Sequence, residues 1–229
     1  MRRVLCVRTG FAVRGLLLLL MAATAATAAD VSAVVRGVEK RYRAARTLQA
    51  VFLHRYSESR NALRVESGTV YFCRGGKMRW EYESPEEKLF VADGKMVWFY
   101  VPADRTVTRT KMKVSEDWQT PLALLVGRAK FSRVCGRVEL SDVRTSAAEN
   151  IVLRCLPKSA QSGFSEVLLE VDGQYRLVRV SIREPGGVET EFRFGNWQEN
   201  LPLADALFRF VAKPGVAIVD EASLAGPLR

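Results

Sequence analysis

Histidine is nearly absent from this sequence: the 229 residues contain only one, His54. A metal or catalytic site that needs two histidines is therefore excluded, and the nucleophile elbow Gly-x-Ser-x-Gly and the phosphate-binding P-loop are missing as well. The paired acids Glu81/Glu83 and Glu86/Glu87 fall at a predicted strand end and turn, which is typical of solvated charge. The sequence thus predicts no catalytic residue, no metal site and no cofactor, and it favours binding over catalysis.

A long membrane-spanning run is also missing. The apolar run that begins with Leu16–Met21 is too short to cross a bilayer well. It follows a basic segment and precedes Ala26-Thr27-Ala28, the small-x-small pattern that a signal peptidase accepts. We predict a signal peptide over residues 1–28, with cleavage after Ala28 or Ala29, and a single secreted domain over residues 29–229. Cys6 precedes the apolar run, so no lipidated anchor is expected.

Negative charge is in deficit, because the chain has a formal net charge of +10. Residues 1–28 hold four arginines and no acid, which leaves +6 on the secreted part. The basic residues are spread along the chain without a nucleic-acid motif, so no nucleic-acid partner is expected. Three cysteines remain after cleavage, and no metal-site spacing relates them. We expect Cys135 and Cys155 to pair, because they belong to neighbouring predicted strands and Cys73 lies inside an aromatic stretch.

What the sequence does contain is the stretch Gly68–Val101, in which runs of β-branched and aromatic residues alternate with turn dipeptides. The dipeptides Gly75-Gly76, Ser84-Pro85 and Asp93-Gly94 predict turns between antiparallel strands. Both faces of the last strand are apolar, one formed by Met96, Trp98 and Tyr100 and the other by Val97, Phe99 and Val101. Something must cover each face. The strand lies either in the middle of a two-layer core or in a curved sheet that encloses an apolar cavity.

The remaining chain predicts an amphipathic helix over Val31–Leu48, a first strand from Leu48, and a loop at Ser57–Asn61. A short helix over residues 120–127 is apolar all round, which suits either core packing or a lid. The other predicted strands are Arg105–Lys113, Asn150–Leu156, Ser165–Val171, Tyr175–Arg183, Glu189–Trp197 and Phe208–Phe210, and a helical turn is predicted at Leu203–Asp205. The fold class is mainly β (α+β), a curved antiparallel sheet of about ten to eleven strands.

Several blocks, in order, carry a family resemblance. They are Leu48–Phe52, Gly68-Thr69, Arg74, Met78–Tyr82, Pro85, Leu89–Lys95, Val97–Tyr100, Pro121–Leu125 with Gly127, Phe208–Phe210 and Pro214–Val216. Together they resemble the periplasmic lipoprotein carrier family LolA, and they cover most of the secreted chain. The sequence departs from the family at Gly75, where a proline is usual after the arginine, and at His54, where the family tends to have glutamine.

The resemblance implies an incomplete β-barrel closed by a helical lid, with an apolar cavity for acyl chains. It implies a monomeric periplasmic carrier that takes triacylated lipoproteins from an inner-membrane ABC transporter and passes them to an outer-membrane acceptor, without bond-making chemistry or a cofactor. With the doubly apolar strands, it predicts a cavity lined or closed by Phe52, Met78, Trp80, Phe90, Trp98, Tyr100, Leu122 and Leu125.

Two alternatives remain open. A periplasmic lipid or lipoprotein sensor uses the same kind of open barrel, although such a sensor usually carries a further domain or anchor. Arg74 is either a surface charge or, by its match to the family arginine, a latch. A guanidinium has five donors, so Arg74 at the barrel rim would bind carbonyl groups at the end of a lid helix.

Overall fold

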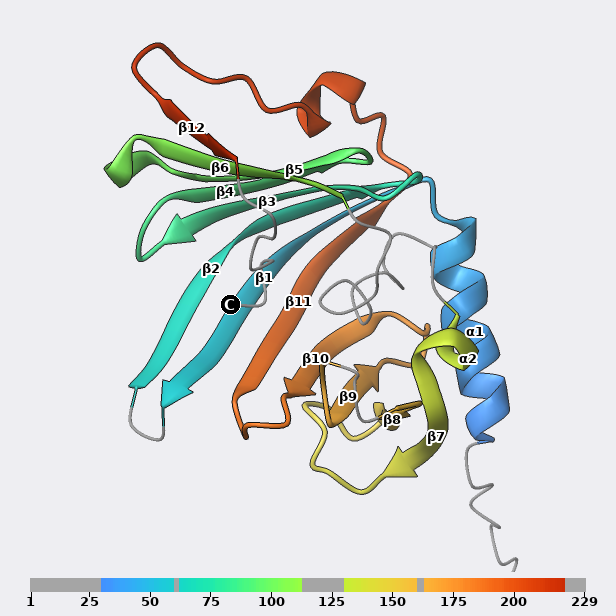
Figure 1. Cartoon of the computed structure of the whole chain (residues 1–229). Coiled ribbons are helices and arrows are strands. Elements are labelled where there is room, and N and C mark those ends of the chain that lie inside the picture. Colours follow the sequence, from blue (N-terminus) through green and yellow to red (C-terminus); the bar gives the residue numbers. More distant parts are fainter. Residues whose placement is uncertain (1–29, 60–61, 113–129, 160–162, 221–229) are drawn as a thin grey trace, which may run out of the picture.

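The computed structural model describes residues 30–59, 62–112, 130–159 and 163–220 (Figure 1). None of the helices in these ranges has the length and apolar character that a bilayer crossing requires. The elements in chain order are α1 (Val31–Ala44), β1 (Thr47–Ser59), β2 (Ala62–Cys73), β3 (Lys77–Ser84), β4 (Lys88–Asp93), β5 (Met96–Val101), η1 (Pro102–Asp104), β6 (Thr106–Lys111), α2 (Phe131–Val134), β7 (Cys135–Ser141), β8 (Ile151–Pro157), β9 (Glu166–Val171), β10 (Leu177–Arg183), β11 (Glu189–Glu199), η3 (Asp205–Phe208) and β12 (Ala217–Asp220).

The twelve strands of the described residues form one sheet in the order β12-β6-β5-β4-β3-β2-β1-β11-β10-β9-β8-β7. The sheet is strongly curved and open, with β12 and β7 at its two edges (Figure 1). The prediction of a mainly β, strongly curved and incomplete barrel is confirmed. One pair departs from the antiparallel prediction, because β12 runs parallel to β6.

Helix α1 begins where the sequence places it and ends earlier. The Asp30 carboxylate accepts a hydrogen bond of 2.9 Å from the backbone N–H of Ser32 and caps the first turn. Val34, Val38 and Tyr42 form its buried stripe. The helix stops at Ala44 because the chain already enters β1 at Thr47, so the predicted end at Leu48 is wrong.

The turns of the central stretch are confirmed. Gly75 and Gly76 join β2 to β3 with φ values of 93° and 81°, a backbone region that favours glycine. Gly94 joins β4 to β5 with φ of 94°, and the Asp93 carboxylate accepts hydrogen bonds of 2.7 Å from the N–H groups of Lys95 and Met96. These local contacts fix the register of the hairpins.

Other boundaries differ from the prediction. β1 continues through Ser59, so the predicted loop that begins at Ser57 is wrong at its start. The strand expected at Cys135, whose bounds were not predicted, is β7 (Cys135–Ser141). Phe208–Phe210 is not a strand, because Phe208 ends the 3-10 helix η3 and the final strand comes later, at β12. The predicted short helix at residues 120–127 lies outside the described residues.

The strand register divides the sheet into two faces. Val70 pairs with Trp80, Trp80 with Phe90 and Phe90 with Phe99, so these side chains share one face. We call it the inner face; on the other half of the sheet it carries Phe192. Its side chains and the buried stripe of α1 belong to one hydrophobic core. The opposite face, which carries Trp98 and Arg179, is the outer face.

Candidate ligand-binding face

The inner face is apolar over most of its length. Large side chains from β1, β2, β3, β4 and β11 meet around Trp80, which is fully buried. The ring of Trp80 contacts four phenylalanine rings edge-on or tilted, with centroid distances of 4.9 Å to Phe52, 5.2 Å to Phe192, 5.7 Å to Phe72 and 6.2 Å to Phe194. Such pairs add to the free energy gained from burial alone. The arrangement offers a continuous hydrocarbon-like surface to anything that enters between the sheet and the elements that cover it.

A polar cluster formed by His54, Glu66 and Lys88 interrupts this surface. His54 is 1% exposed, and its imidazole stacks on Phe192 with ring centroids 4.3 Å apart and planes 8° apart. Its Nδ1 atom lies 3.5 Å from Oε2 of Glu66, whose other oxygen is bound by Lys88. Burial lowers the pKa of His54 from its usual value of 6.5, although Glu66 opposes this shift. The ring is therefore neutral near pH 7.

Glu66 stays ionised in this setting. Burial alone would raise the pKa of its carboxyl group, but the hydrogen bonds and charges of His54 and Lys88 outweigh burial and lower the pKa below 4.5. The sequence pointed to His54 only as a lone histidine without a partner. Its place in the period-two set with Phe52 and Tyr56 was the available signal, but the pairing of His54 with Glu66 depends on the register of β1 with β2.

The structure places four of the predicted cavity residues on the inner face. Phe52, Met78, Trp80 and Phe90 are all buried there, at 3% exposure or less. Leu122 and Leu125 lie outside the described residues. Whether the four inner residues contact acyl chains stays a prediction.

Trp98 and Tyr100 do not belong to that set. Trp98 pairs with Val91 and Arg109, and Tyr100 pairs with Leu89 and Val107, so both aromatic rings lie on the outer face. The prediction that they line the same cavity as Trp80 is therefore corrected. The prediction failed for a physical reason. When both faces of a strand are apolar, alternation shows which residues share a face but not which face points inward.

The outer aromatic residues are covered by the segment that follows β11. Phe210 stacks on Trp98 with ring centroids 5.4 Å apart and contacts Tyr100 at 5.6 Å. Arg79 donates a hydrogen bond of 3.2 Å to the carbonyl group of Leu207 and so holds this segment down. A groove of about 510 Å³ remains at its margin, lined in part by Leu89, Tyr100, Phe210, Arg209 and Lys213. The sequence predicted that something covers each face of this strand. Helix α1 shares the core of the inner face, and the segment with Phe210 covers the outer face.

Arg74 lies at the C-terminal end of β2, against the last turn of α1. Its guanidinium donates hydrogen bonds of 2.6 Å to the carbonyl group of Arg43, 3.0 Å to Ala44 and 3.2 Å to Ala45. The last carbonyl groups of a helix have no partner within the helix, so Arg74 satisfies three acceptors at once. These contacts favour the alternative in which Arg74 binds carbonyl groups at a helix end over the alternative in which it is only a surface charge.

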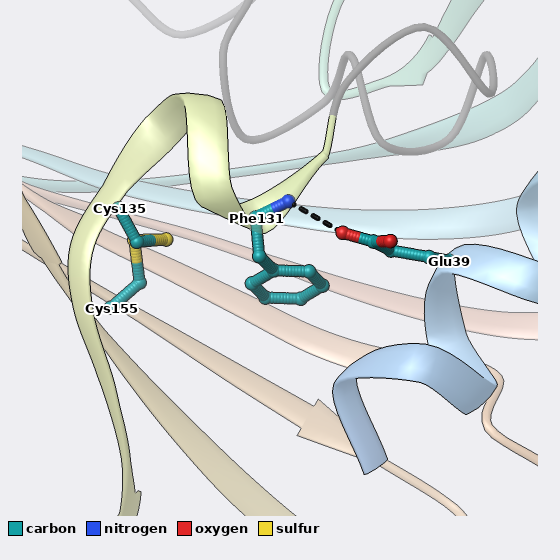
Figure 2. The surroundings of a disulfide bond; sticks show 4 residues. All are labelled: Glu39, Phe131, Cys135 and Cys155. Carbon is teal, nitrogen blue, oxygen red and sulfur yellow. Dashed lines mark hydrogen bonds between the residues drawn. A yellow bond between two sulfur atoms is a disulfide. The ribbon is translucent and has the colours of Figure 1, made fainter. Parts of the chain in front are cut away.

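A disulfide joins the edge strand β7 to its neighbour β8. Cys135, at the start of β7, is bonded to Cys155 of β8, which confirms the predicted pair; Cys73 is free. Figure 2 shows that this bond lies beside Phe131 of α2, whose backbone N–H donates a hydrogen bond of 2.8 Å to the Glu39 carboxylate of α1. Helix α1 is thereby connected to the β7 edge at its middle and to β2 through Arg74 at its end. Among the described residues, no group of three potential ligands could hold a metal ion.

Comparisons with known proteins agree with this geometry. The family model of the outer membrane lipoprotein carrier protein LolA matches residues 43–211. An outer-membrane lipoprotein carrier protein from Nitrosospira multiformis is 32% identical over 179 residues, which cover 77% of this chain and 84% of that protein. The corresponding protein from Methylococcus capsulatus is 30% identical over 178 residues, covering 77% and 83%.

Among solved structures, an uncharacterized conserved protein from Thermus thermophilus aligns with a TM-score of 0.54. It is 16% identical to this chain, and the alignment covers 83% of this chain and 98% of the other. At this identity the likeness concerns the fold.

Proposed function

This chain belongs to the LolA family of outer-membrane lipoprotein carriers, and we propose that it carries lipoproteins through the periplasm with their acyl chains held against the inner face. Its cargo would be triacylated lipoproteins, received from an inner-membrane ABC transporter and delivered to an outer-membrane acceptor. The family assignment supports a binding role, and the chain would act without a cofactor or a bond-making step. A signal peptide over residues 1–28 would direct it to the periplasm.

The observation that carries the proposal is the continuous apolar inner face around Trp80. Each methylene of an acyl chain costs about 0.8 kcal/mol to expose to water, so a long chain needs roughly 10 kcal/mol of apolar contact to travel through an aqueous compartment. Phe52, Met78, Trp80 and Phe90 supply such contact from neighbouring strands.

Loading requires movement, because these side chains are buried in the present conformation. Helix α1 shares their core, and Arg74 ties its last turn to β2 through three carbonyl groups. We propose that Arg74 is a latch that favours the closed, empty carrier. Entry of acyl chains would break hydrogen bonds that contribute about 0.5 to 3 kcal/mol each, and their re-formation would favour release of the cargo to the acceptor.

Native mass spectrometry of the protein purified from its own periplasm tests the carrier role. We expect a fraction of the protein to have the mass of a complex with an acylated lipoprotein, and spheroplasts to release lipoproteins when the purified protein is added. A protein that is free of lipoproteins in the first measurement and inactive in the second would contradict the proposal.

The latch is tested by Arg74→Leu in a two-step assay that measures loading and transfer to the acceptor separately. Loading should stay intact and transfer should decrease, because the variant no longer gains the closed-state hydrogen bonds on release. Arg46→Leu is the matched control, since Arg46 is an exposed neighbouring arginine. Normal transfer by Arg74→Leu, or a defect in loading alone, would refute the latch.

A further inference from the structure

Two buried N–H-bearing rings on the inner face have polar atoms without a hydrogen-bond partner in the described parts of the chain. They are the imidazole of His54, at Nε2, and the indole of Trp80, at Nε1, while Nδ1 of His54 faces Oε2 of Glu66 at 3.5 Å. His54 is 1% exposed and Trp80 is 0% exposed. Buried polar atoms in native proteins nearly always have partners, and an exception calls for an explanation such as a ligand that is not present.

Both rings contact one phenylalanine, Phe192. The centroid of Phe192 is 4.3 Å from that of His54 and 5.2 Å from that of Trp80. All three residues project from the inner face, since Phe192 pairs with His54 across β1 and β11 and Trp80 pairs with Val70 of β2. A ligand that lies along Phe192 would therefore meet both polar groups.

The two polar groups have opposite hydrogen-bonding character. The indole Nε1–H of Trp80 is a donor only. In His54 the Glu66 carboxylate lies 3.5 Å from Nδ1 and favours the tautomer with its proton on that nitrogen. The other nitrogen, Nε2, is among the ring atoms farthest from the backbone and is then an acceptor. The neutral state follows from burial, which lowers the pKa of the imidazole.

We propose that His54 and Trp80 form a subsite that binds a secondary amide, with Trp80 donating to the amide oxygen and His54 accepting from the amide N–H. This inference rests on the proposed carrier function and deepens it, because an amide attaches one acyl chain to the amino-terminal cysteine of a triacylated lipoprotein. A lipid with ester linkages alone has the oxygen but lacks the N–H. The subsite would thus separate acylated protein from ordinary glycerolipid.

A fatty acid carboxylate is a poorer occupant of the subsite. It has no N–H for His54 Nε2, and it would place an anion near Glu66, which is ionised. The positive charge of Lys88 is already offset by its ion pair with Glu66. A plain hydrocarbon would leave both buried polar groups unsatisfied. The amide is the group that satisfies both.

A matched pair of probes tests the inference: the N-methylamide and the methyl ester of the same long-chain fatty acid, alongside a triacylated lipopeptide. The wild-type protein should bind the amide about tenfold more tightly than the ester, as expected for one additional hydrogen bond in a buried site. Equal affinity for amide and ester, with the lipopeptide still bound, would overturn the subsite and leave the carrier function standing. A protein that binds none of the three would overturn both.

Variants separate the two roles. His54→Leu should weaken binding of the amide alone, whereas His54→Gln should keep the preference because its side-chain oxygen is an acceptor. Trp80→Phe should weaken amide and ester alike, since both have a carbonyl oxygen. Trp98→Phe is the control, because Trp98 lies on the outer face. If His54→Leu weakens amide and ester equally, His54 has only a packing role and the inference is wrong.

A measurement on the wild-type chain avoids any question of folding. Because the sequence has one histidine, selective ¹⁵N labelling gives ring signals that belong to His54 alone. The signal of the unprotonated ring nitrogen should shift on addition of the amide and of the lipopeptide, and should stay in place with the ester. A shift of the same size with the ester would overturn the assignment of Nε2 as the acceptor.

Discussion

On strands β10 and β11 the outer face carries Arg179, Glu191 and Arg193, while the inner face carries Val180 and Phe192. The outer charges form ion pairs, both across the strands, as between Arg179 of β10 and Glu191 of β11 at 3.8 Å, and within β11, as between Arg193 and Glu191 at 2.8 Å. The inner face has few polar groups, and its buried ring nitrogens lack partners within the described residues. The outer face of these strands thus carries charged groups that meet in ion pairs, whereas their inner face is apolar, as the proposed carrier function requires.

The largest expected difference between the two faces comes from removing one tryptophan from each of them. Trp80→Ala should lower the free energy of unfolding by about 3 to 5 kcal/mol, because it opens a cavity among buried aromatic rings. Trp98→Ala should cost less, about 1 to 2 kcal/mol, since Trp98 is half-buried and stacks mainly on Phe210. Urea unfolding at pH 7 measures both. Equal losses would mean that the two faces are packed alike.

The contrast between the two tryptophans also shows which features of the fold could be predicted from the sequence. The turns at Gly75-Gly76 and Asp93-Gly94, the helix start at Val31 and the Cys135–Cys155 pair are local or nearly local features, and they were predicted. The side of the sheet on which Trp98 lies depends on which elements cover each face, and alternation within a strand does not contain that information.

Long-range pairing explains the other differences. The segment Phe208–Phe210 has a strand-like composition, yet its rings pack on the outer face, where Phe210 meets Trp98. Glu66 meets His54 only because β1 and β2 pair in one particular register. β7 has few buried apolar residues apart from Cys135, so period-two alternation is weak there. Within the candidate site, the sequence identified the apolar residues Phe52, Met78, Trp80 and Phe90, but not the polar pair of His54 and Glu66.

An intermediate effect is expected from the ion pairs of the outer face. Glu170 is fully buried and accepts hydrogen bonds from Ser146 and Asn150, and it lies 2.9 Å from Nε of Arg179. Burial would raise the pKa of Glu170, but these partners outweigh it and lower the pKa. Glu170→Gln should reduce the free energy of unfolding by about 1 to 3 kcal/mol, because Arg179 loses its closest charge partner.

Urea unfolding measures the stability of Glu170→Gln, and Glu189→Gln is the control variant. Glu189 is half-exposed and lies 3.8 Å from Arg183, so its replacement should change the stability by less than about 0.5 kcal/mol. Lipopeptide binding should be unchanged in both variants, because both residues lie on the outer strand positions or at their ends. A Glu170→Gln protein that is as stable as the wild type, or that binds lipopeptide weakly, would show that the two faces are not independent.

The smallest expected effect concerns the pH dependence of stability and compares His54 with Glu66 on the inner face. The pKa of His54 in the folded protein is below 6.5, so the unfolded chain takes up the proton at a higher pH than the folded protein does. The unfolded state therefore binds more protons as the pH falls below about 6.5, and the free energy of unfolding decreases, by at most about 1.4 kcal/mol per pH unit for one proton.

Glu66 acts in the same direction at lower pH. Its folded pKa is below 4.5, so its stabilising contribution is present above pH 4.5 and is lost as the pH falls through the lowered value. His54→Gln should flatten the decrease between about pH 7 and pH 5 and leave the decrease below pH 4.5, which thermal unfolding at a series of pH values would measure. Because the wild-type chain has one histidine, no second imidazole can supply the upper slope. If His54→Gln shows the same decrease in stability between pH 7 and pH 5, His54 is not buried as a neutral ring. The assignment of its Nε2 as a hydrogen-bond acceptor would then be wrong as well.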